Sequence, residues 1–143
     1  MTAGLIVIIV AAVLLLALMG AKPRRQRSPQ RRSARSFDVG LVQTRWQTVE
    51  QMSRSGGAGL RNAVSEADKL LDYVLRGKGF SGETMAVRLK RAEGRLSDKE
   101  AVWGAHKLRN NLAHEVGFDL VASQAHEALA AFRQALTDLG VPS

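Results

Sequence analysis

Apolar residues recur at intervals of three and four along most of this chain, which is the spacing of amphipathic helices. The predicted helices span residues 41–52, 60–75, 81–89, 98–116 and 123–139. No proline occurs between Pro29 and Pro142, and a capping-box pattern, Ser97-x-x-Glu100, precedes the fourth segment. The pattern therefore predicts an all-α fold, an antiparallel bundle of four or five helices, preceded by one transmembrane helix.

The transmembrane prediction rests on an uncharged, mostly aliphatic run from Ala3 to Ala21. About 20 apolar residues are enough to span a bilayer as a helix. A cleaved signal peptide is the alternative, but the run lacks a basic segment before it and a pair of small residues at a cleavage position. We expect a retained transmembrane helix at residues 1–21, a disordered linker at residues 22–37 and a helical domain at residues 38–143.

The linker is strongly basic and contains no acidic residue. Its charged side chains are Lys22, Arg24, Arg25, Arg27, Arg31, Arg32 and Arg35. Cytoplasmic flanks of membrane spans carry such an excess, which predicts an N-terminus outside and a cytoplasmic domain at the cell membrane. Attraction to the anionic headgroups of the lipid bilayer is the favoured role of these residues, and RNA capture is the alternative.

The net charge of +8 belongs almost entirely to this linker. Residues 37–143 hold fourteen basic and thirteen acidic side chains, so the predicted helical domain has no strong basic surface of its own. The chain has no cysteine and only three histidines, and these histidines lack metal-binding spacing. We expect no metal site and no cofactor.

The chemistry-bearing stretch of the domain is Leu-Arg-Asn-Asn-Leu-Ala-His-Glu, residues 108–115, on the fourth predicted helix. Helical spacing makes Asn110 and His114 neighbours, whereas Arg109 lies about 140° around the helix from His114. The predicted inward stripe consists of Ala101, Val102, Ala105, Leu108 and Leu112. The predicted opposite side holds Trp103, His106, Lys107, Asn110 and His114.

Arg109-Asn110, followed by three residues and His114, resembles the Arg-polar-x-x-x-His motif of HEPN domains, which are small helical bundles. Leu108, Leu112 and Ala113 also match the common form of the motif. The resemblance implies a metal-independent RNA endonuclease, in which His114 transfers protons and Arg109 stabilises the phosphorane. Asn110 would orient His114 or the phosphate. It also implies a homodimer, because one histidine does not easily act as both base and acid in one step.

Two alternatives remain open at this point. Many members of the HEPN family are non-catalytic, so the domain is alternatively a membrane-tethered module for dimerisation, protein interaction or nucleotide binding. The family often adds an acidic partner from an earlier helix, and Glu66, Asp68 and Asp72 are the candidates. A purely structural role is the other reading, with Asn110, Asn111 and His114 in a hydrogen-bond network and Arg109 paired to an upstream aspartate.

Overall fold

The computed structural model describes residues 37–142, and within them it contains helices and no strands. Five α-helices and one 3₁₀ turn follow one another, namely α2 (Val39–Ser53), α3 (Gly57–Gly77), α4 (Met85–Ala92), η1 (Glu93–Arg95), α5 (Lys99–His114) and α6 (Ala122–Asp138). The predicted all-helical class is therefore confirmed for this part of the chain. The predicted helices are all present, with ends that shift by a few residues.

The helix starts depend on side-chain caps. Asp38 accepts a hydrogen bond from the Leu41 N–H at the start of α2, and Asp98 accepts one from the Ala101 N–H at the start of α5. Such caps satisfy backbone donors that have no partner inside the helix. The prediction that Ser97 caps α5 was wrong by one residue. The backbone N–H and Oγ of Ser97 instead donate to Asp138 at the end of α6.

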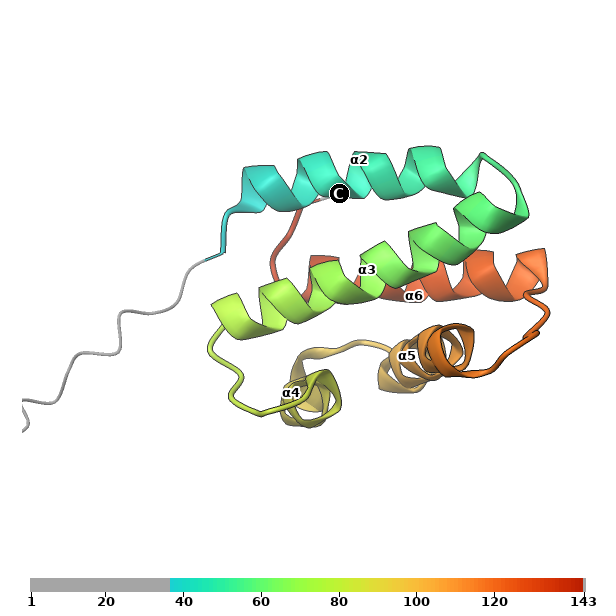
Figure 1. Cartoon of the computed structure of the whole chain (residues 1–143). Helices are drawn as coiled ribbons and strands as arrows, with labels where there is room; N and C mark the ends of the chain where they lie inside the picture. Colours follow the sequence, from blue (N-terminus) through green and yellow to red (C-terminus); the bar gives the residue numbers. More distant parts are fainter. Residues whose placement is uncertain (1–36, 143) are drawn as a thin grey trace, which may run out of the picture. The chain divides into compact units, whose positions relative to one another are not determined.

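The helices are not all antiparallel. In Figure 1, α2 runs opposite to α3, whereas α6 runs in the same direction as α3. α4 and α5 are seen nearly end-on in this view, so both cross α3 at a steep angle (Figure 1). These two helices form the connection between α3 and α6, and this crosswise path lets α6 start near the same end as α3.

The hydrophobic core surrounds α3, which packs against each of the other four α-helices. Its apolar side chains repeat at helical spacing from Leu60 to Leu75 and are buried. Phe132 and Leu136 of α6 and Leu89 of α4 are completely buried against it. Trp46 of α2 is also buried in this core. α3 is thus the element against which the other helices are positioned.

The predicted transmembrane helix and the seven basic linker residues lie outside the described residues. No helix between residues 37 and 142 combines the length and the apolar composition that crossing a bilayer requires. Phe37, placed at the end of the predicted linker, packs against the core. Its Cβ lies so close to α3 that a Cβ added at Gly77 would be 2.6 Å away, so the packed part of the chain includes this residue.

Candidate functional site

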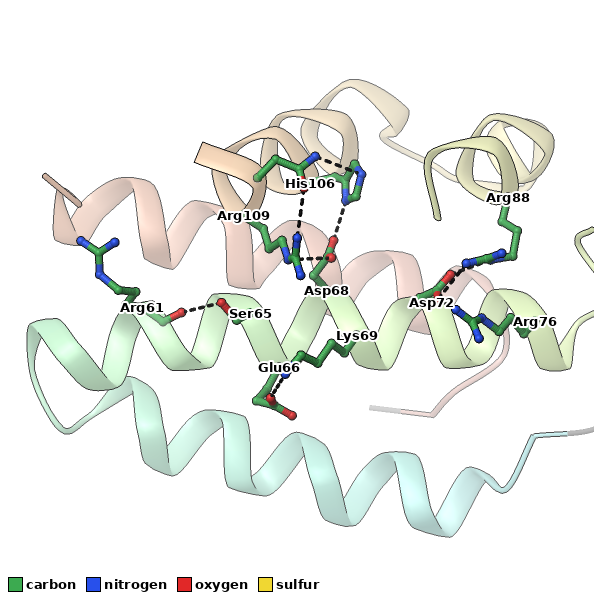
Figure 2. Close-up of polar contacts among 11 residues, drawn as sticks. Arg61, Ser65, Glu66, Asp68, Lys69, Asp72, Arg76, Arg88, His106 and Arg109 are labelled. Carbon is green, nitrogen blue, oxygen red and sulfur yellow. Dashed lines mark hydrogen bonds and ion pairs between the residues drawn. The ribbon is translucent and has the colours of Figure 1, made fainter. Parts of the chain in front are cut away.

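Four polar side chains from α3 and α5 form a closed ring (Figure 2). His106 Nδ1 lies 2.7 Å from Asp68 Oδ1, and His106 Nε2 lies 3.3 Å from Asn110 Nδ2. Arg109 Nη1 donates to Asn110 Oδ1 at 3.2 Å. The ring closes where Arg109 Nε lies 3.4 Å from Asp68 Oδ2, an ion pair rather than a well-formed hydrogen bond. Two of the three residues of the sequence motif, Arg109 and Asn110, belong to this ring.

Helical spacing explains how α5 presents three residues of the ring together. His106 precedes Arg109 by three residues and Asn110 by four, so the three side chains share one face. Val102 and Ala105 of the same helix are buried and bring this face against α3. Asp68 stands on α3 between the buried residues Val64 and Leu71, at their helical spacing. Packing of the apolar residues thereby places Asp68 beside the α5 face.

The ring is largely excluded from solvent. Asp68 is 4% exposed and His106 is 8% exposed, whereas the side chain of Arg109 is 28% exposed. A buried carboxylate is costly unless it is paired and hydrogen-bonded, and here His106 and Arg109 supply these contacts. The prediction that His106 lies on the side of the helix opposite to the core was wrong. A histidine with a buried partner can take an inward position that an apolar pattern assigns to other residues.

A second polar cluster lies one helical turn further along α3. Arg88 of α4 donates to Asp72 through two nitrogens, with Nε to Oδ1 at 2.6 Å and Nη2 to Oδ2 at 2.9 Å. Arg76 approaches the same carboxylate at 2.6 Å. Arg88 is buried and also donates to the backbone carbonyl of Gly82. The bidentate pair of Arg88 and Asp72 joins α4 to α3, and Arg76 shares the Asp72 carboxylate (Figure 2).

A cavity of about 500 Å³ connects the ring and the second cluster. Side chains of α3, α4 and α5 and of the turn before α4 line it, and its lining residues are Asp68, Lys69, Asp72, Arg76, Glu83, Thr84, Met85, Ala86, Arg88, His106, Arg109 and Asn110. Four of them are Lys or Arg and three are Asp or Glu, so the lining is close to neutral. A ligand in the cavity would contact Arg109 and Asn110, which are among the lining residues.

The third motif residue, His114, lies apart from the ring. It is the last residue of α5 and is exposed. No side-chain hydrogen bond joins it to any other described residue, and the polar contacts of the Arg109 guanidinium are with Asn110 and Asp68. Since the two residues are five positions apart on one helix, they are about 7.5 Å apart along its axis. One copy of the described chain therefore does not assemble the complete motif at a single point.

The three acidic candidates have three different surroundings. Asp68 contacts Arg109 and His106, and Asp72 holds Arg88 and Arg76. Glu66 makes an ion pair with Lys69 of its own helix at 2.6 Å, in an exposed position that lines a groove between α2 and α3. Asp68 is thus the acid that meets the motif. No cluster of metal-ligand residues was found between residues 37 and 142.

Reasoning from the sequence missed His106 and Arg88 as parts of this region. One indication was present, because Asp68 interrupts an otherwise apolar stripe of α3. A carboxylate in such a position needs a buried partner. His106 shares a face with Arg109 and Asn110, so it was the available partner on the motif helix.

Comparison with known proteins identified no relative. No family model, no curated protein and no solved structure matches this chain.

Proposed function

We propose that this chain is a HEPN-like, metal-independent RNA endonuclease that is tethered to the membrane and works as a homodimer. The observation that carries the proposal is that the motif residues lie in two separate places on α5. Arg109 and Asn110 line a cavity, while His114 is exposed at the end of the same helix. An exposed histidine is available to a second copy of the chain.

The chemistry follows from the residue types. A 2′-hydroxyl of RNA attacks the adjacent phosphorus, loses its proton to a general base, and forms a 2′,3′-cyclic phosphate. The bond from phosphorus to the 5′-oxygen breaks, and a general acid gives that oxygen a proton. His114 supplies the proton transfers, which a histidine performs well near neutral pH. Arg109 stabilises the negative charge that accumulates on the phosphorane oxygens.

Two copies solve the difficulty that one histidine presents. In a single step one group must accept a proton while another donates one, and each copy contributes one His114. A symmetric interface places the same surface of both copies face to face, so the two α5 ends meet if this helix lies at the two-fold axis. Arg109 of one copy then reaches the phosphate that lies between the two histidines.

RNA cleavage by the full chain in detergent, with EDTA present, tests the proposal. We expect His114→Ala to lower the rate by about 100-fold, which is the typical scale of acid–base catalysis. His126→Ala is the matched control, because His126 is also an exposed helical histidine but lies outside the motif. Cleavage by His114→Ala at the wild-type rate, or no cleavage by the wild-type chain at any concentration, contradicts the endonuclease.

A non-catalytic interaction module is the second candidate, and one observation favours it. The Arg109 guanidinium is already engaged by Asp68 and Asn110 within one copy, as expected for a structural arginine. Such a module would dimerise or bind a protein or a nucleotide through this surface and leave RNA intact. A chain that forms dimers and shows no cleavage, with His114→Ala identical to the wild type, supports the module over the nuclease.

We further propose that residues 1–21 anchor the chain with the helical domain on the cytoplasmic side. The apolar run followed directly by seven basic residues supports this orientation. The basic residues bind anionic headgroups at the membrane surface. A reporter fused after Ser143 should report a cytoplasmic location, and a reporter on the outer side contradicts the orientation.

A further inference from the structure

The ring of four side chains has only one consistent arrangement of its donors and acceptors. Arginine can only donate, so the atom of Asn110 that faces Arg109 must be the amide oxygen. The amide nitrogen of Asn110, a donor, therefore faces His106 Nε2. That ring nitrogen must accept, which means that it carries no proton. The other ring nitrogen, Nδ1, then carries the proton and donates it to Asp68 Oδ1.

In this arrangement the tautomer of His106 decides the orientation of the Asn110 amide, and that orientation decides whether Arg109 finds an acceptor. If His106 Nε2 carried a proton, the Asn110 amide would have to turn its oxygen toward it. The amide nitrogen would then face the guanidinium of Arg109, and two donors would oppose each other. Asp68 favours the same arrangement of donors and acceptors. One of its oxygens accepts the hydrogen bond from His106 Nδ1, and the other forms the ion pair with Arg109. The tautomer of His106 and the placement of the Arg109 guanidinium are therefore coupled through Asn110.

We propose that His106 is a positioning residue. In its neutral, Nδ1-protonated form it fixes the orientation of the Asn110 amide, and this amide holds the Arg109 guanidinium in the lining of the cavity. The part of this inference that concerns catalysis rests on the proposed function. His106 is not itself a catalytic residue, since it is 8% exposed and both of its ring nitrogens are engaged. Before His106 could transfer a proton to a substrate, its hydrogen bonds to Asp68 and Asn110 would have to break.

The tautomer can be read directly from the nitrogen chemical shifts of the histidine side chains in the full chain. In the wild type we expect protonated Nδ1 and unprotonated Nε2 at His106. Asn110→Asp keeps the shape but has two acceptor oxygens, so we expect Nε2 of His106 to become protonated. Asn110→Leu removes the hydrogen bond to His106 Nε2 and puts no acceptor in its place. The proton should therefore stay on Nδ1, where Asp68 still accepts the hydrogen bond. The exposed His114 and His126 serve as internal references.

The positioning role predicts a particular kinetic result. His106→Ala should lower kcat for RNA cleavage about tenfold with little change in KM, because Arg109 acts on the transition state. The double variant with Asn110→Ala should be no slower than the slower single variant, since both substitutions break the same coupling. If His106→Ala does not fold, the nitrogen shifts of Asn110→Asp still decide the question.

The outcomes separate the two proposals. A wild-type chain that does not cleave RNA contradicts the nuclease, while protonated Nδ1 in the wild type and a new Nε2 proton in Asn110→Asp still support the coupling. A wild-type proton on Nε2, or unchanged shifts in Asn110→Asp, overturns the coupling even if RNA is cleaved. Cleavage by His106→Ala at the wild-type rate overturns the positioning role.

Discussion

Asp68 contacts two side chains of α5, so both His106 and Arg109 depend on one buried carboxylate. We expect Asp68→Ala to lower the free energy of unfolding by about 3 kcal/mol, because it leaves buried polar partners without an acceptor. Glu66→Ala is the matched control on the same helix. Its pair with Lys69 is exposed, so the loss should stay below about 1 kcal/mol. Urea denaturation measures both, and equal losses would show that the ring contributes nothing beyond an exposed ion pair.

The motif identified Arg109 and Asn110 from the sequence, and Asp68 was one of three acidic candidates. His106 was assigned to the outer face because apolar periodicity counts only apolar positions. Its burial follows from Asp68, and Asp68 is tolerated in the apolar stripe of α3 because of His106. The apolar pattern of one helix cannot show that a polar residue on it has a buried partner on another helix. This explains why the position of His106 became clear only when the two helices were placed together.

At the scale of helices, the start of α3 meets the end of α2 at a glycine. A Cβ at Gly59 would lie 2.2 Å from the carbonyl oxygen of Met52, whereas a Cβ at Gly104, in the middle of α5, would meet nothing within 4 Å. Gly59→Ala should therefore lower the melting temperature, by an amount corresponding to about 2 kcal/mol for a forced backbone shift. Gly104→Ala should raise stability by about 0.5–1 kcal/mol through helix propensity. Two changes of the same sign would contradict this packing.

The end of α6 is tied to the turn before α5 through Asp138. Burial raises the pKa of this carboxyl, but the hydrogen bonds from Ser97 and Gln134 outweigh it and hold the pKa below its usual range. A lowered folded-state pKa contributes stability above the ordinary aspartate range, and the contribution is lost as the pH falls through the folded value. Asp138→Asn should therefore cost about 1 kcal/mol near pH 7, and the cost should shrink as the pH falls through the folded-state pKa. A cost that is independent of pH contradicts this role.

The helix positions could be predicted from apolar spacing, and the helix ends depended on particular caps. α4 begins at Met85 rather than Ser81 because the Thr84 hydroxyl caps it. α5 begins after Asp98 for the same reason. The directions of the helices were harder to predict. Short connections suggest antiparallel neighbours, but α4 and α5 lie across α3 and return the chain to the end where α6 starts (Figure 1).

At the scale of the whole molecule, the described part of one chain presents the motif in two separate places. Arg109 and Asn110 belong to the ring with Asp68, whereas His114 is exposed at the end of α5. The proposed nuclease therefore depends on an encounter between two copies. Tethering to a membrane would favour that encounter by confining the copies to a surface, so full-length chains in vesicles should dimerise at lower total protein than chains without residues 1–36. Crosslinking at matched protein amounts compares the two, and equal dimer yields would show that the N-terminal segment has no such effect.

If the nuclease is built from two copies of this chain, its rate must depend on the fraction of dimer. With EDTA present, the rate of RNA cleavage per mole of full chain should fall on dilution in step with the fraction of dimer measured by light scattering. Under the same conditions His114→Ala should remain about 100-fold slower than the wild type at every concentration. A rate per mole that stays constant while the dimer dissociates, or no cleavage by the fully dimeric wild type, would contradict a nuclease built from two copies of this chain.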